Sequence, residues 1–163
     1  MEDCQTELTR RMILYYSGDP KRIQHFLKVH AFAALIGRLE GVDGETLETL
    51  ETAALVHDIG IRVSEEKFGR CDGKLQEREG PPVAEALLTE LGYSPERIAR
   101  VSWLIAHHHT YDQISGPDYQ ILVEADFLVN AYEDSLPPSA IRRMGEKVFS
   151  TKTGKRLLEQ IYR

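Results

Sequence analysis

The sequence predicts an all-α protein, a single-domain helical bundle, on the strength of three observations. Apolar residues recur at three- and four-residue spacing along most of the chain. Strict alternation of apolar and polar residues over five or more positions is hard to find. Most helical stretches also carry a capping or a stop residue. At 163 residues the chain is long enough for one domain with a buried core, so we expect one domain over residues 1–163.

The expected helices follow one another along the whole chain. The stretch "GDPKRIQHFLKVHAFAALIGRLEG" has Asp19 as N-cap, Pro20 at the first helical position and Gly41 as its stop. The next helix, in "DGETLETLETAALVHDIG", ends before Gly60, and Ser94 caps a later one. We expect about eight helices, at about residues 3–16, 20–40, 45–58, 80–91, 95–108 and 118–133 and in the segments "SAIRRMGEKVF" and "KTGKRLLEQIY".

Residues 61–78, "IRVSEEKFGRCDGKLQER", mix charge with glycine and show no sustained period. We expect them to form a surface segment that covers the end of the second long helix. This segment, the loop "TYDQISGPDYQ" and the C-terminal helices are where substrate recognition is expected, although no sequence pattern there identifies a base or a sugar.

Composition and charge exclude several classes of function. A formal net charge of −6 argues against a broad footprint on a nucleic-acid polymer. The start of the chain resembles neither a secretory signal nor a transit peptide, and no apolar run approaches the roughly 20 residues that a membrane-spanning helix needs. The two cysteines, Cys4 and Cys71, provide neither a disulfide framework nor a zinc finger. We therefore expect a cytoplasmic protein that needs no membrane.

Several polar residues fall on helical faces that should be buried. His25 shares a face with Val29, Phe32 and Ile36. Taken alone, His25 would be explained by a hydrogen bond to a carbonyl group inside the core. His30 points about 140° away from His25, by the 100° rotation per residue of a helix, and we expect it to be structural.

Asp126 presents the same problem, because it shares a face with Leu122 and Val129 in "QILVEADFLVNA". His57 and Asp58 lie in the apolar stretch "ETAALVHDIG". An isolated buried carboxylate costs several kcal/mol, so a proton, a basic side chain or a metal ion must compensate for it. A single divalent ion would neutralise both carboxylates, whereas a buried salt-bridge network would need Lys or Arg on these faces, where the sequence has few.

The order of these residues resembles the HD superfamily of metal-dependent phosphohydrolases. The resemblance covers about residues 22–132 and includes "RIQHFLKV", "AALVHDIG" and "EADFLVNA". It implies a helical bundle in which His25, His57, Asp58 and Asp126 bind a divalent metal. It leaves the metal open among Mn, Mg, Fe, Co, Ni and Zn.

Members of the superfamily with two metals have additional histidines, and here the match is incomplete. His108 and His109 end the "RVSWLIAHH" helix as such a pair does. We expect His107 to be a polar residue at the end of that helix, where the helix dipole favours histidine. The remaining position falls on Glu79, counted back from "VAEALL". Glu79 could bind a second metal, act as a base or cap a helix, so we expect one ion and leave a second open.

The resemblance implies hydrolysis of a phosphate mono- or diester of a small molecule, with a nucleotide as the first candidate. Asp58 would orient or deprotonate a metal-bound water. Arg22 and Lys74 are the candidate contacts for the phosphate, although either could be a solvated surface charge. The sequence does not decide whether the protein forms a homo-oligomer.

Two other functions stay open. Some two-iron relatives in this superfamily are oxygenases, and Glu79 in place of histidine argues against that chemistry. The domain could also bind a metal or a nucleotide as a regulatory module without turnover, which the intact set of ligands argues against. The sequence has no GxSxG, GxxxxGK[ST] or GxGxxG pattern that would indicate another kind of active site.

Overall fold

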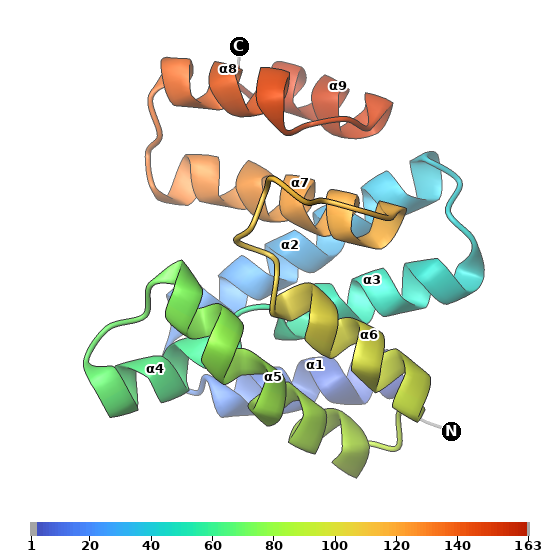
Figure 1. Cartoon of the computed structure of the whole chain (residues 1–163), viewed down its shortest axis with the longest axis vertical. Helices are drawn as coiled ribbons and strands as arrows, with labels where there is room; N and C mark the ends of the chain where they lie inside the picture. Colours follow the sequence, from blue (N-terminus) through green and yellow to red (C-terminus); the bar gives the residue numbers. More distant parts are fainter. Residues whose placement is uncertain (1–2, 163) are drawn as a thin grey trace.

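The computed structural model of the chain describes residues 3–162, and these residues form nine α-helices and no β-strand (Figure 1). The all-α prediction is confirmed. The helices are α1 (Cys4–Tyr15), α2 (Pro20–Leu39), α3 (Gly44–Val56), α4 (Gly60–Phe68), α5 (Gly73–Glu90), α6 (Pro95–Ile105), α7 (Pro117–Glu133), α8 (Pro138–Lys147) and α9 (Lys152–Ile161).

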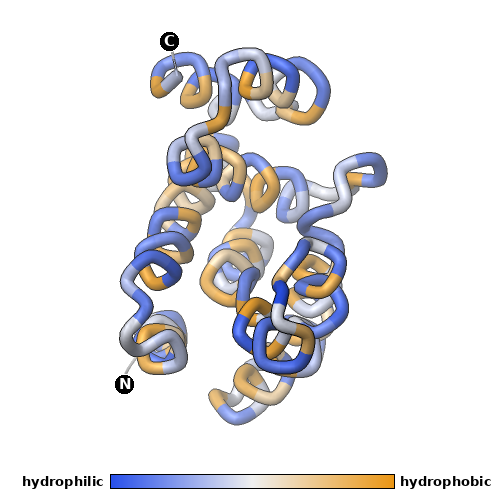
Figure 2. The backbone as a smooth tube through the Cα atoms, turned by 90° about the vertical axis from the view of Figure 1, so that its left-hand side faces the viewer, coloured by the Kyte–Doolittle hydropathy of each residue, from blue (hydrophilic) through white to orange (hydrophobic). Residues whose placement is uncertain are grey.

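Helices α2, α3 and α7 form the centre of the bundle and contribute much of its buried apolar core. Figure 1 shows α5 and α6 on one side of this centre and the pair α8 and α9 stacked beyond α7. Along the outer helices the tube of Figure 2 changes between hydrophobic and hydrophilic residues within single turns, as amphipathic helices do. None of the helices among residues 3–162 combines the length and the apolar character needed to cross a membrane.

The capping and stop residues predicted from the sequence lie at the helix ends in the structure. The Asp19 carboxylate accepts a hydrogen bond from the Arg22 backbone amide, and the Ser94 hydroxyl caps α6 in the same way. Gly41 follows α2 with a φ of 73°, a conformation that favours glycine. These contacts explain why the first and last turns fall close to the predicted positions.

More than half of residues 61–78 are exposed, as predicted for a surface segment, but most of them are helical, which the prediction did not include. Residues Gly60–Phe68 form α4, which ends at Gly69 with a φ of 68°. Asp72 then caps α5, which begins seven residues earlier than the sequence suggested. Helix α4 has only nine residues and packs extensively against α5, so tertiary contact contributes to its stability.

A close approach of two glycines fixes the turn between α3 and α4. A Cβ atom added to Gly60 would lie 2.8 Å from the carbonyl oxygen of Gln76 and 2.8 Å from the backbone nitrogen of Gly80. Only glycine therefore allows α4 to start this close to α5. His57 and Asp58 lie in this turn, directly after the last residue of α3.

Candidate metal centre

Three segments of the bundle bring four of the predicted metal ligands together. His25 comes from α2, His57 and Asp58 from the turn after α3, and Asp126 from α7. His25 Nε2 lies 3.0 Å from an Asp58 oxygen and 3.2 Å from Asp126 Oδ1. His57 Nε2 lies 3.3 Å from an oxygen of each carboxylate and 3.2 Å from His25 Nε2. The four side chains therefore converge on one point.

Backbone hydrogen bonds orient two of the imidazoles in the site. The Nδ1–H of His57 donates to the carbonyl oxygen of Ala54 at 2.7 Å, and the Nδ1–H of His108 donates to that of Ile105 at 2.7 Å. Because the proton of each neutral ring is then on Nδ1, its Nε2 presents a lone pair to the cluster. Helix ends that present free carbonyl groups thus set the tautomer of both rings.

Glu133 orients the third imidazole. Its carboxylate accepts a hydrogen bond from His25 Nδ1 at 2.5 Å and pairs with Lys28 at 3.1 Å, while its side chain is only 11% exposed. A carboxylate on the far nitrogen of a histidine is the usual support of a metal ligand. Glu133 is not among the residues predicted from the sequence, although it follows Asp126 by seven residues and so lies two turns along the same face of α7.

The residues present fit a divalent cation. Within residues 3–162, Asp126 Oδ1 and His108 Nε2 are buried without a hydrogen bond of acceptable geometry. Buried polar atoms of this kind are costly unless a ligand satisfies them. A cation bound beside each of these atoms would satisfy it, and nitrogen and carboxylate oxygen atoms are suitable ligands for Mn, Mg, Fe, Co, Ni or Zn.

The electrostatics of the cluster favour added positive charge. Burial alone would lower the pKa of His25 and His57, but the adjacent Asp58 and Asp126 carboxylates outweigh it and raise these pKa values to about 11 and about 10. Burial likewise opposes ionisation of Asp58 and Asp126, yet the imidazoles around them hold both pKa values below the ordinary value. Protons and a metal ion would therefore compete for the same position.

A second group of possible ligands adjoins the first and shares Asp58 with it. One atom each of Asp58, His108 and His109 lie within 4.8 Å of one another. Burial lowers the pKa of His109 to about 4, so this ring is neutral near pH 7. Its Nε2 lies 3.0 Å from the side-chain oxygen of Gln76 on α5. A carboxylate shared by two groups could bridge two ions.

The structure does not bring Glu79 into either group. Glu79 pairs instead with Lys67 of α4 at 3.5 Å and with its neighbour Arg78 at 3.2 Å. Because α5 begins at Gly73, the residue that this helix presents to the centre is Gln76, one turn earlier. Counting along the sequence could not locate it, because the facing residue depends on how α5 is rotated against α3 and α6.

A pocket of about 540 Å³ opens onto the centre, and its walls include Asp58, Asp126 and His109. Arg22 lines this pocket but already pairs with Glu65 and Asp19. The walls also include Lys21, Gln76, Asn130, Glu133 and Asp134.

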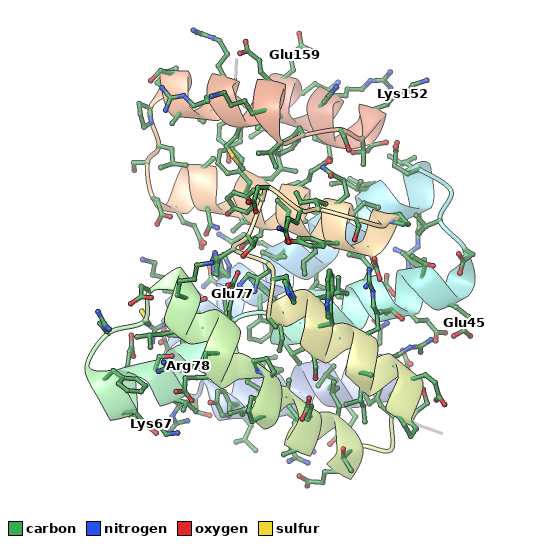
Figure 3. The ribbon with its side chains drawn as sticks, in the orientation of Figure 1. Glu45, Lys67, Glu77, Arg78, Lys152 and Glu159 are labelled. Carbon is green, nitrogen blue, oxygen red and sulfur yellow. The ribbon has the colours of Figure 1, made fainter. Side chains whose placement is uncertain are left out.

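Lys74 does not line this pocket. It is 80% exposed and lies near Glu77, which is labelled in Figure 3, and near Thr110. Glu77 in turn accepts hydrogen bonds from the backbone amide of His109 and the hydroxyl group of Thr110, at the start of the loop after α6. Glu77 therefore ties that loop to α5, and Lys74 belongs to the surface around this contact.

The remaining two histidines lie outside both ligand groups. His107 donates from Nδ1 to the carbonyl oxygen of Trp103 at 2.7 Å and stacks on its ring. His30 lies 3.2 Å from the side-chain oxygen of Gln5 on α1. Both positions agree with a structural role.

Comparison with known proteins identifies the family. A family model for the HD domain matches residues 22–143. The chain is similar to the crystal structure of a predicted HD superfamily hydrolase from an uncultured Thermotogales bacterium, with 28% identity, a TM-score of 0.69 and coverage of 96% of this chain and 84% of that chain. Bacillus subtilis YpgQ has a similar fold, with 18% identity, a TM-score of 0.66 and coverage of 97% and 88%. No curated protein gave a significant match. Since the HD match spans most of the sequence and both ligand groups, the chain belongs to the HD domain family.

Proposed function

We propose that the protein is a metal-dependent phosphohydrolase that cleaves a phosphate mono- or diester of a small molecule, with nucleotides as the first class to test. The observation that supports this most directly is the convergence of His25, His57, Asp58 and Asp126 around buried, unsatisfied ligand atoms. The similar Thermotogales protein is described as a predicted hydrolase, which agrees with this chemistry.

Two sets of residues would hold the ions. His25, His57, Asp58 and Asp126 would hold the first, and Asp58, His108 and His109 a second. The other candidate ligands are imidazoles and carboxylates. Helix α5 contributes the neutral amide of Gln76 beside His109 of the second set, and an amide is a weaker ligand. We therefore expect one tightly bound ion, and a second ion with lower affinity.

Asp58 is the residue we assign to proton transfer. A bound divalent ion supplies a water of lowered pKa and positive charge for the phosphoryl oxygens. One Asp58 oxygen lies beside His25 and His57, the other lies 3.6 Å from His108, and the residue lines the open pocket. The second oxygen can accept a proton from the attacking water, and His25 and His57 hold the carboxylate in place.

The test is elemental analysis of protein purified without added metal, followed by phosphate release from a panel of phosphate esters. We expect a bound divalent ion, turnover by the wild type, and a loss of at least about a hundredfold in Asp58→Ala with an unchanged circular dichroism spectrum. Asp112→Ala is the matched control, because Asp112 is an exposed aspartate that does not line the pocket.

Other outcomes would point elsewhere. A fully active Asp58→Ala variant would remove Asp58 from the mechanism. Bound iron with oxygen consumption and no phosphate release would identify an oxygenase of the same superfamily. Bound metal without turnover on any ester would indicate a regulatory module. A cytoplasmic location, the absence of a nucleic-acid polymer as partner and the oligomeric state stay predictions.

A further inference from the structure

Lys21 differs from the other basic residues in the first part of the chain. Between residues 3 and 133, each of the other lysines and arginines has an acidic oxygen within 4.0 Å. Lys21 has none in the described chain, although it lines the pocket above the metal centre. Its charge is therefore available to a ligand in that pocket.

The position of Lys21 connects it to the metal centre. It precedes His25 by four residues on α2, so the two side chains lie one helical turn apart on the same face. Both line the same pocket. Lys21 and His25 are therefore both exposed to a ligand that occupies this pocket.

Asn130 holds the corresponding position on α7. It follows Asp126 by four residues, lines the same pocket and is half-buried. Its side-chain amide makes no hydrogen bond to any residue of the described chain. Thus each of the two helices that supply His25 and Asp126 presents, one turn away from its ligand, a polar side chain with no ion-pair or hydrogen-bond partner among residues 3–162.

The other charges in the pocket explain why Lys21 rather than Arg22 is free to bind. The hydrogen bond and charge of Glu65 raise the pKa of Arg22, and Asp19 contacts the same guanidinium group. Asp134, one turn beyond Asn130, also lines the pocket and has no basic partner within residues 3–162. Among the residues that the structure describes, the pocket therefore has one cation and one acid without an ion-pair partner, which limits the negative charge it can accept.

We propose that Lys21 and Asn130 form a subsite for a second anionic group of the substrate, adjacent to the phosphoryl group that reacts at the metal centre. The chemistry fits a carboxylate or another phosphoryl group, since an ammonium donates to either and the amide can donate alongside it. This inference rests on the proposed function for the reacting group, but the subsite can be measured by binding alone.

The test compares three probes on manganese-loaded protein by isothermal titration calorimetry. Inorganic phosphate has one anionic centre, phosphonoacetate adds a carboxylate, and methylenediphosphonate adds a second phosphonate. We expect the wild type to bind at least one of the two larger probes more tightly than phosphate. Lys21→Met should weaken that probe about tenfold and change phosphate binding far less. The probe that responds identifies the second anion as a carboxylate or a phosphoryl group.

Three further variants make the comparison specific. Lys21→Arg should restore most of the affinity. Lys152→Met should bind as the wild type does, because Lys152 is also an exposed lysine but does not line the pocket and points away from the body of the protein (Figure 3). Asn130→Ala should weaken the same probe as Lys21→Met, and Asp134→Asn should strengthen it by a few-fold because a negative charge leaves the rim.

The proposal is overturned if Lys21→Met binds every probe as tightly as the wild type, or if the wild type binds neither larger probe better than phosphate. Hydrolysis is scored separately. Binding that depends on Lys21 in a protein that hydrolyses no ester would contradict the proposed function and leave the subsite standing. A protein that hydrolyses an ester but binds every probe independently of Lys21 would support the proposed function and contradict the subsite.

Discussion

At the scale of single residues, the candidate centre depends on where a few protons are held. His25, His57 and His108 each have Nδ1 engaged by an oxygen atom, so each directs Nε2 to the cluster. For two of the rings the oxygen is a backbone carbonyl that no substitution can remove. For His25 the oxygen belongs to the side chain of Glu133. The contribution of this hydrogen bond to metal binding can therefore be tested by substituting Glu133.

We predict that Glu133→Gln lowers the metal affinity by about 10- to 100-fold, the usual effect of removing a carboxylate that supports a ligating histidine. The metal affinity of each variant can be measured by competition with a chelator of known affinity. Glu146→Gln, an exposed glutamate on α8, should bind metal as the wild type does. Unchanged affinity in Glu133→Gln would mean that Glu133 serves only its surface ion pair with Lys28.

At the scale of helices, the position of the ligand-bearing turn depends on how closely α4 approaches α5. Gly60 lies against the backbone of Gln76 and Gly80, and backbone atoms cannot rotate aside as a side chain can. A Cβ atom added to Gly80 would instead have its nearest neighbours at 3.6 Å or more, an ordinary contact. The two glycines face one another, yet only one of them is required.

We predict that Gly60→Ala lowers the free energy of unfolding by about 1 to 3 kcal/mol, as overpacking of a filled interface does. It should also weaken metal binding, because relief of the clash moves the turn that carries Asp58. Gly80→Ala is the matched control and should be neutral, or stabilising by up to about 1 kcal/mol because alanine favours a helix. Chemical denaturation with and without metal measures both, and equal behaviour of the two variants would contradict the packing argument.

At the scale of the whole molecule, the charged cluster links folding to pH and to metal. The pKa values of His25 and His57 are raised in the folded protein, so their stabilisation is complete below about pH 6.5 and is lost as the pH rises towards about 10 and 11. The pKa values of Asp58 and Asp126 are lowered, so their stabilisation is present above about pH 4 and is lost as the pH falls.

We predict that the metal-free protein, held in a chelator, loses stability as the pH is raised from 6.5 to 9. The additional stability provided by saturating manganese should increase over the same range, because the metal must displace protons from the two imidazoles. Denaturation at several pH values in chelator and in metal measures both trends. A metal increment that does not change with pH would contradict the assignment of His25 and His57 as ligands.

The sequence by itself determined the helical class, most helix ends and the four residues that converge in the centre. Those features are local or depend on burial: caps act within one turn, and a histidine or an aspartate on an apolar face needs a partner wherever the neighbouring helices lie. The starts of the helices after Asp19 and Ser94 follow from the first rule, and the need of His25 and Asp126 for a partner follows from the second.

Only the tertiary structure decided which residues surround that centre. Helix α4 packs against α5, and Gln76 rather than Glu79 faces His109 because of the rotation of α5. Glu133 supports His25, and Lys21 rather than Arg22 keeps a free charge, because of partners far away along the chain. Such contacts depend on the distance and rotation between packed helices, and the local pattern of one helix encodes neither.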